Sequence, residues 1–164
     1  MKFEPKVIWS FGLILVILVV GIIGRIQYEK KNAHTADGPR TIPVMLGGQT
    51  LNAVVADTPA LQEKGLSGTS QIEESQAMLF VFDKPGKYPF WMRDMKYSID
   101  IIWMDQEHHI VHIKEHAEPS SFPKTFGNEV TSASVLEVSD GFVAKNGVKV
   151  GDEVLFTVLH SDES

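Results

Sequence analysis

The segment FWMRDMKYSIDIIWMD, residues 90–105, combines several side chains that could bind a ligand. It contains two of the chain's three tryptophans, three of its six methionines, three aspartates and one arginine. Aromatic walls with a few placed polar groups are typical of pockets for small molecules and sugars. The candidate ligand-binding residues are Trp91, Met92, Arg93 and Asp100.

Asp100 lies in a run, IDIIWMD, that predicts a β-strand covered on both sides. Successive side chains of a strand point to opposite faces, and apart from Asp100 both faces of this run are mainly apolar. A buried carboxylate must be paired or hydrogen-bonded, or its pKa rises. Asp100 could accept N–H bonds from the turn at residues 94–98, pair with Arg93, or form the floor of a pocket walled by Trp91 and Met92.

Three functions are compatible with these residues. The one we favour is non-catalytic binding of a small or extended ligand, such as a glycan. The second is a carboxylate-dependent hydrolase that uses Asp100 and a second acid, for example Glu137. The third is a purely structural or partner-docking module. Glu137, in the run LEVSDG, is more simply interpreted as an outward-facing or ion-paired strand residue.

Other kinds of chemistry have little support in the sequence. The chain has no cysteine and no G-x-S-x-G motif for a nucleophilic serine. The histidines of EHHIVHIKEH follow a strand-like alternation, and residues four apart on a strand stand about 13 Å from each other, too far to share one metal ion. We therefore expect no catalytic residues, no metal and no cofactor.

The elements that would position these residues are mainly β-strands. Two apolar runs around Gly47-Gly48 predict a β-hairpin. Thr58, Pro59 and Gly65 predict the cap, first turn and end of a two-turn helix. Further strands are predicted at 77–82, 88–93, 99–105, 109–116, 134–138 and 153–160, with a second short helix after Ser139. Many short strands with little helix predict a small β-sandwich or barrel-like domain with one or two short helices.

An uncharged run of eighteen residues begins at Val7 and ends at Gly24. As a helix it would be about 27 Å long, close to the roughly 30 Å of a bilayer's hydrocarbon core. It exceeds the about 7–15 apolar residues of a secretory signal, and no A-x-A cleavage pattern follows it. The run predicts a single, uncleaved N-terminal transmembrane helix.

The predicted organisation is a short tail, an anchor, a linker and one domain. A short tail before an anchor usually stays in the cytoplasm, so we expect a single-pass cell-membrane protein with its domain outside the cytoplasm. The segments are a cytoplasmic tail at 1–6, the anchor at 7–24, a linker at 25–39, the β domain at 40–160 and a tail at 161–164.

The charge of the chain limits its partners. The formal net charge is −6, and the sequence has no basic cluster of the kind that binds nucleic acid. We expect no nucleic-acid partner. The expected partners are the membrane, through residues 7–24, and an unknown small molecule, glycan or envelope protein.

Several motifs resemble those of the family called domain of unknown function 192. Over residues 40–156, their order and spacing match in GLSGT, MLFVF, FWMRDM, SIDIIWMD and LEVSDGFVAKNGVKVGDEV. Ser67, Asp94-Met95 and Tyr97-Ser98 depart from the usual residues of that family. The family is an uncharacterised group of bacterial and archaeal proteins, often secreted or membrane-anchored. The resemblance implies a compact, mostly β fold of sandwich type with a short helix, and it brings no established activity.

Overall fold

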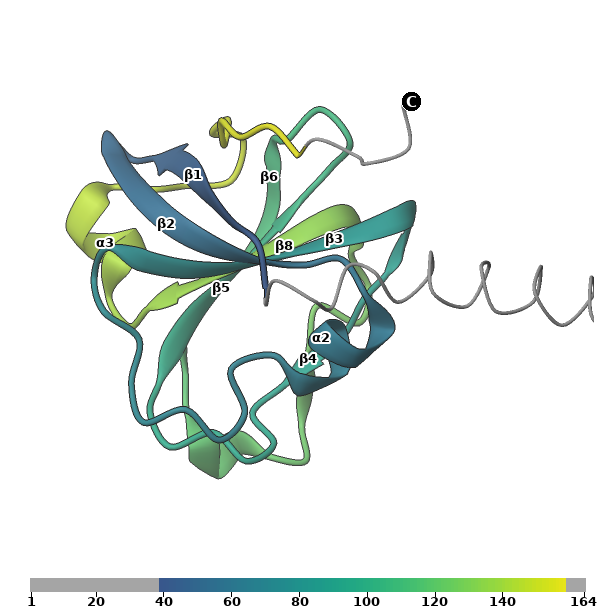
Figure 1. Cartoon of the computed structure of the whole chain (residues 1–164), viewed down its shortest axis with the longest axis vertical. Helices are drawn as coiled ribbons and strands as arrows, with labels where there is room; N and C mark the ends of the chain where they lie inside the picture. The colour runs from purple at the N-terminus through teal and green to yellow at the C-terminus, as the bar shows by residue number, and fades with distance from the viewer. Residues whose placement is uncertain (1–38, 159–164) are drawn as a thin grey trace, which may run out of the picture. The chain divides into compact units, whose positions relative to one another are not determined.

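The domain begins with the predicted β-hairpin. The computed structural model describes residues 39–158 (Figure 1). Strands β1 (Thr41–Leu46) and β2 (Gln49–Ala56) pair in antiparallel orientation. Gly47 and Gly48 between them have φ angles of +57° and +74°, which glycine adopts without the clash that a Cβ atom brings. The hairpin prediction is confirmed.

Helix α2 (Pro59–Lys64) follows β2 and is also formed as predicted. The hydroxyl of Thr58 accepts the backbone N–H of Leu61 at 3.3 Å and caps the helix. Pro59 occupies the first turn, where its missing N–H does no harm. Gly65 ends the helix with a φ of +50°.

Six strands form the main sheet, in the order β1-β2-β3-β8-β5-β6. The four not yet described are β3 (Gln76–Lys87), β5 (Ile99–Met104), β6 (Ile110–Ala117) and β8 (Thr131–Ser139). β2 and β3 are parallel, with α2 in their connection, and every other neighbouring pair is antiparallel. β8 therefore lies inside the sheet, between β3 and β5.

A second, two-stranded sheet pairs β4 (Phe90–Trp91) with β7 (Thr125–Phe126). The remaining elements are the 3-10 turn η2 (Pro119–Ser121) and helix α3 (Phe142–Asn146). Figure 1 shows α2 and β4 together at one side of the domain and α3 at the other. The predicted mainly β fold with one or two short helices is confirmed.

Three predicted strands differ from the observed ones. β3 continues past residue 82, the predicted end of the strand, to Lys87, and its pairing with β8 shifts between Val81 and Gly86. The predicted strand at 88–93 is only two residues long, because Met92 turns into the core and Asp94 adopts a φ of +57°. Of the predicted strand at 153–160, the described residues make only isolated bridges.

Those bridges connect the C-terminal segment to both edges of the main sheet. Met45 of β1 and Leu155 exchange two backbone hydrogen bonds of 2.9 and 3.0 Å. His109, just before β6, forms a bridge with Glu153. One segment thereby covers part of both edge strands, whose unpaired N–H and C=O groups would otherwise be exposed.

Strand alternation divides the buried side chains into two clusters, one on each face of the main sheet. The first contains Leu79, Ile102 and Leu136 and includes residues of α3. The second contains Phe80, Ile101, Trp103 and Val135, and includes Phe126 of the second sheet. All six residues of β5 are buried, so the prediction that this strand is covered on both sides is confirmed.

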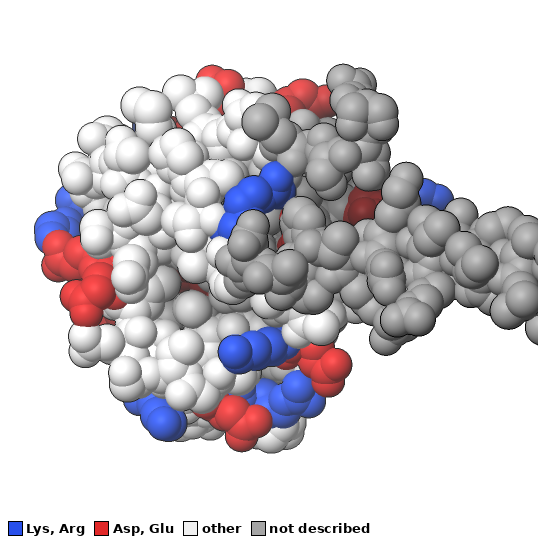
Figure 2. Space-filling model, in the orientation of Figure 1, with Lys and Arg blue, Asp and Glu red and all other residues white. Residues whose placement is uncertain are grey.

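The predicted anchor at 7–24, the two predicted tails and nearly all of the linker lie outside the described residues. Between residues 39 and 158, no helix is long and apolar enough to cross a membrane. On the face drawn in Figure 2, charged side chains of both signs lie in scattered groups, and the area to the left of the centre is mostly uncharged.

Candidate functional site

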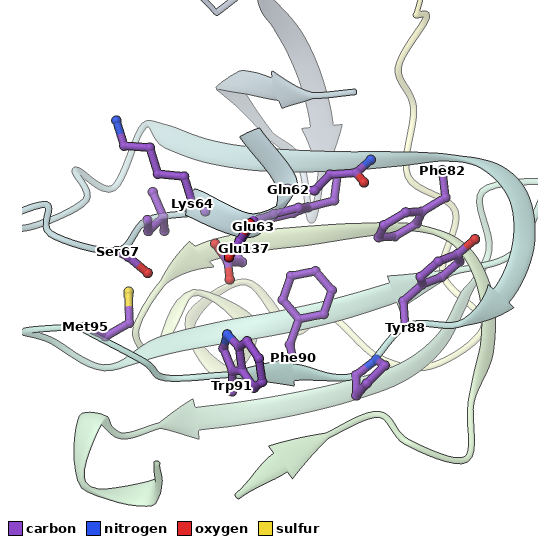
Figure 3. Close-up of a pocket in the computed structure, with 14 residues that line it drawn as sticks. Gln62, Glu63, Lys64, Ser67, Phe82, Tyr88, Phe90, Trp91, Met95 and Glu137 are labelled. Atoms are coloured by element: carbon purple, nitrogen blue, oxygen red, sulfur yellow. The ribbon is translucent and has the colours of Figure 1, made fainter. Parts of the chain in front are cut away.

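A pocket of about 180 Å³ lies between α2, the second sheet and one face of the main sheet. We call it the aromatic pocket (Figure 3). Its walls come from three stretches that are distant in sequence: α2 with the loop after it, the turn from β3 into β4, and the centre of the main sheet. The lining residues are Gln62, Glu63, Lys64, Gly65, Leu66, Ser67, Phe80, Phe82, Tyr88, Pro89, Phe90, Trp91, Met95 and Glu137.

Five aromatic side chains give the pocket its name. The rings of Phe82 and Tyr88 stack with centroids 3.5 Å apart, and those of Phe80 and Phe90 meet edge to face at 4.7 Å. Such ring contacts add stability beyond the buried area. The fifth, Trp91, is 45% exposed at the mouth. The aromatic wall is thus held by its own contacts.

Helix α2 is held over the pocket by the apolar contact of Leu61 with the second core cluster and by hydrogen bonds of Gln62. None of its residues is fully buried. The amide of Gln62 donates hydrogen bonds to the carbonyls of Val81, at 2.8 Å, and Ala56, at 3.3 Å. Because those carbonyls belong to the end of β2 and to β3, Gln62 fixes the helix relative to the main sheet.

Glu137 forms the floor of the aromatic pocket. It lies in the middle of β8, directly opposite Met78 of β3 on one side and Ile101 of β5 on the other. Opposing residues of neighbouring strands point to the same face, so Glu137 stands among the apolar side chains of the second cluster. Figure 3 shows its carboxyl group directed into the space that the labelled residues surround.

The Glu137 carboxyl is buried without a partner. The residue is 5% exposed, and no donor among the described residues reaches its Oε2 atom. Burial raises the pKa of Glu137 from 4.5 to about 8, because removal from water penalises the charged form. At pH 7 a group with a pKa of about 8 is roughly 90% protonated. The floor of the pocket is therefore a neutral carboxylic acid at neutral pH.

Hydrogen bonds hold the loop after α2 against residues 93–97. Ser67 donates its hydroxyl to the carbonyl of Arg93 at 2.8 Å, and the hydroxyls of Thr69 and Tyr97 are 2.6 Å apart. Burial raises the pKa of Tyr97 above its usual 10, opposed by the Thr69 hydrogen bond and assisted by the nearby Glu137. Tyr97 therefore stays neutral over the range in which Glu137 ionises.

The structure does not bring the four predicted site residues together. Trp91 lines the aromatic pocket. The Arg93 guanidinium lies over the Trp91 ring at 4.9 Å and pairs with Glu63 at 3.6 Å, so it belongs to the rim. Met92 is 1% exposed and is part of the second core cluster. That these residues bind a ligand stays a prediction.

Asp100 lies away from the aromatic pocket. It is fully buried, and each of its carboxylate oxygens accepts a hydrogen bond. Its Oδ1 accepts the backbone N–H of His116 at 2.9 Å, and its Oδ2 accepts that of Val143 at 3.0 Å. The prediction that Asp100 bonds to the turn at 94–98 or pairs with Arg93 is therefore wrong. β5 directs the carboxylate toward β6 and α3, and the sequence alone does not show that these elements lie beside it.

Asp100 and Glu137 do not form a carboxylate pair. Asp100 lies opposite Val138, the residue after Glu137, in the β5–β8 ladder. Since side chains alternate along a strand, the two carboxylates point to opposite faces of the sheet. The expectation that Glu137 faces outward or forms an ion pair is also wrong, because the second core cluster and the pocket walls cover the face of β8 to which it points. One sequence signal could have predicted the burial of Glu137: it is an acid between two apolar residues, Leu136 and Val138, in a run typical of a buried strand.

The histidines do not assemble a metal site. Among residues 39–158, no three His, Cys, Asp or Glu side chains come close enough to hold an ion. His112 packs on Trp103 with ring centroids 5.1 Å apart. The Asp140 carboxylate, hydrogen-bonded to His116 Nδ1 at 2.9 Å, raises the pKa of that exposed imidazole.

Two solved structures share the fold of this chain. No curated protein matches the chain. A crystal structure of a protein of unknown function from Novosphingobium aromaticivorans superposes with a TM-score of 0.65 and 27% identity, over 75% of this chain and 90% of that one. One from Sinorhizobium meliloti, described as a "putative transcription regulator", has a TM-score of 0.66 and 27% identity, over 71% of this chain and 94% of that one.

The family resemblance seen in the motifs is confirmed along the whole β domain. The model of the family described as DUF192, "Uncharacterized ACR", matches residues 42–156. The match begins in β1 and ends in the C-terminal segment that bridges the sheet edges, so it includes every residue of the aromatic pocket. Because it spans more than half of the chain, this protein belongs to the DUF192 family.

Proposed function

We propose that the domain binds, without converting it, a small molecule or the end of an extended one in the aromatic pocket. The observation that carries this proposal is the unpartnered Glu137 carboxyl at the floor of an open pocket. Burying a polar group without a hydrogen bond costs free energy. A ligand that supplies the missing partner removes that cost, so the folded domain is prepared for one.

The size and walls of the pocket define what fits. Its volume of about 180 Å³ is below the roughly 300–1,000 Å³ of pockets that hold drug-sized molecules. It accommodates a group of a few heavy atoms, such as one end of a longer chain or one sugar unit of a glycan. The aromatic faces favour an apolar or planar surface on that group.

The hydrolase alternative has no support in the geometry. Hydrolysis by two carboxyl groups requires them about 5–9.5 Å apart in one cleft. Asp100 points to the opposite face from Glu137 and is occupied by two backbone N–H groups. We therefore keep binding as the proposed function.

We propose further that residues 7–24 anchor the protein in the cell membrane and that the domain lies outside the cytoplasm. The support for this proposal is the uncharged eighteen-residue run and the short tail before it. In that arrangement the aromatic pocket faces the cell envelope, where a glycan, a small molecule or an envelope protein would be its ligand.

Two methionines allow the binding proposal to be tested by NMR with 13C-methyl-methionine. Met95 lines the aromatic pocket, whereas Met45 is 51% exposed on edge strand β1 and is not among the lining residues. We expect a panel of fragments with fewer than about ten heavy atoms to contain members that shift the Met95 methyl signal and leave Met45 unchanged. A panel that includes amines, acids, alcohols and monosaccharides and moves neither signal contradicts the proposal.

A further inference from the structure

The floor of the aromatic pocket has no cationic side chain of the described residues beside Glu137. Within residues 39–158, no lysine, arginine or histidine forms an ion pair with Glu137. Lys64 lines the pocket from α2, but Figure 3 shows its ammonium group pointing outward, away from Glu137. The other charged group of the lining, Glu63, already pairs with Arg93 at the rim. The charge that the floor lacks is therefore a cation to pair with the ionised form of Glu137.

The aromatic walls favour the same sign of charge. The face of an aromatic ring carries the negative part of its quadrupole and attracts a cation within about 6 Å. The attraction is strongest where the cation is desolvated. Arg93 already uses the face of Trp91 in this way at 4.9 Å, at the rim. Within residues 39–158, no lysine or arginine lies over the inner rings, Phe80, Phe82, Tyr88 and Phe90.

We propose that the aromatic pocket binds an ammonium group at the end of a short alkyl chain, which pairs with Glu137 and lies against the aromatic walls. The inference rests on the proposed binding function and specifies the chemistry of its ligand. An anion is repelled by Glu137 once that carboxyl ionises. It would also lose its hydration shell against ring faces that do not attract a negative charge. A neutral group satisfies the carboxyl but gains nothing from the ring faces beyond contact.

Binding of an ammonium group exchanges one ion for another. At pH 7 the Glu137 carboxyl holds a proton, and an ammonium within about 4 Å stabilises the carboxylate form. The balance is one ammonium bound and one proton released from Glu137 to solvent. The titratable groups that line the pocket besides Glu137 are Glu63, Lys64 and Tyr88, and Tyr97 lies near enough to Glu137 to interact with it electrostatically. Of these, Tyr97 stays neutral because its pKa lies above 10.

The test compares three probes of one shape and different charge: n-butylammonium, n-butanol and butyrate. Each is titrated into the full-length chain in a non-ionic detergent and an amine-free buffer, with the Met95 methyl signal as the readout and Met45 as the reference. We expect n-butylammonium to bind most tightly. With a pKa of about 8 for Glu137, its affinity should rise about tenfold from pH 7 to pH 9 as the competing proton is removed.

Two variants complete the experiment. Glu137→Gln keeps the neutral shape and cannot ionise, so it should bind n-butylammonium at least about tenfold more weakly at pH 9 and n-butanol no more weakly than the parent. Glu129→Gln removes a carboxylate that is 88% exposed and does not line the pocket; it should change either affinity less than about twofold, because its attraction is screened by salt. A folded Glu137→Gln protein is verified by an unchanged Met45 signal and a cooperative melting curve at pH 6.

The outcomes separate the two proposals. If n-butanol or butyrate binds at least as tightly as n-butylammonium, or if the ammonium affinity is the same at pH 7 and pH 9, the ammonium inference is overturned while the binding function stands. If no probe and no fragment shifts Met95, both are overturned. A preference for the ammonium that is lost in Glu137→Gln supports both.

Discussion

At the scale of single residues, Glu137 and Asp100 show how one kind of group can be buried in two ways. Asp100 is enclosed with two backbone donors, one for each carboxylate oxygen. Glu137 is enclosed with none for Oε2, and burial raises its pKa to about 8. The first arrangement stabilises the fold. The second leaves a group whose ionisation opposes folding, which is typical of positions kept for binding or catalysis.

The free energy of unfolding should therefore fall with rising pH because of Glu137. Its pKa is 4.5 as a reference and about 8 in the folded domain, so between these values the folded state holds a proton that the unfolded state has lost. Stability from this group is fully present below about pH 4.5 and is lost as pH rises through 8. At about 1.4 kcal/mol per pKa unit, the loss approaches about 5 kcal/mol.

The measurement is a set of denaturant melts of the parent and Glu137→Gln at pH 5, 6.5, 8 and 9. Residue 137 of the variant cannot ionise. We therefore expect the free energy of unfolding of the variant, relative to that of the parent, to rise steadily across this range, and the variant to be the more stable protein at pH 9. Other groups, His116 among them, titrate in both proteins and cancel in the difference. Parallel pH profiles for the two proteins would show that Glu137 has an ordinary pKa.

At the scale of elements, Asp100 connects three of them. It belongs to β5, its Oδ1 accepts the N–H of His116 near the end of β6, and its Oδ2 accepts the N–H of Val143 in the first turn of α3. The first N–H groups of a helix have no partner within the helix. Asp100 thus caps α3 from a neighbouring strand, in a helix whose N-cap, Gly141, has no side chain to do so.

Asp100→Asn should weaken this connection without changing the aromatic pocket. The asparagine amide keeps the shape and can accept only one of the two N–H groups, which leaves the other buried and unpaired. We expect a loss of about 1–3 kcal/mol in the free energy of unfolding, measured by denaturant melts, and unchanged binding of the pocket probes. Asp105→Asn is the matched control. Its carboxylate accepts the N–H of His109 at 2.8 Å in an exposed turn, so the loss there should be under about 1 kcal/mol.

If Asp100→Asn leaves stability unchanged and weakens ligand binding, Asp100 is part of the ligand site rather than a structural link. That result would return the site to the segment 90–105 as a whole.

At the scale of the whole molecule, the C-terminal segment and the pocket belong to the same unit. The bridges at Met45 and His109 bring the last described residues onto both edges of the main sheet, and the family match covers the chain from β1 to this segment. All described residues fall within one compact unit. The proposed anchor would add attachment to a membrane.

Protease accessibility tests the proposed topology. If residues 7–24 hold the domain outside the cytoplasm, protease added to intact cells whose outer layer has been made permeable should digest the domain. A cytoplasmic protein of the same cells should stay intact as a control for lysis. Protection of the domain until the cells are lysed would place it in the cytoplasm.

The sequence by itself determined the features that depend on neighbouring residues. Gly47-Gly48 predicts the hairpin because two left-handed residues are needed there. Thr58 and Gly65 predict the ends of α2 because a cap and a stop act within one turn. The alternation in β5 predicts its two buried faces, since side-chain direction follows from the backbone alone.

The tertiary structure alone decided what surrounds each acid. The donors to Asp100 are 16 and 43 residues away in the chain. Glu137 lies at the floor of a pocket because β8 is placed between β3 and β5 in the sheet. This strand order differs from the order in the chain, so local sequence patterns do not predict it. Whether a buried carboxylate is bonded or free depends on which distant backbone groups the fold brings within about 3 Å of it. The sequence of a single strand does not specify those distant groups, so only the tertiary structure reveals the site.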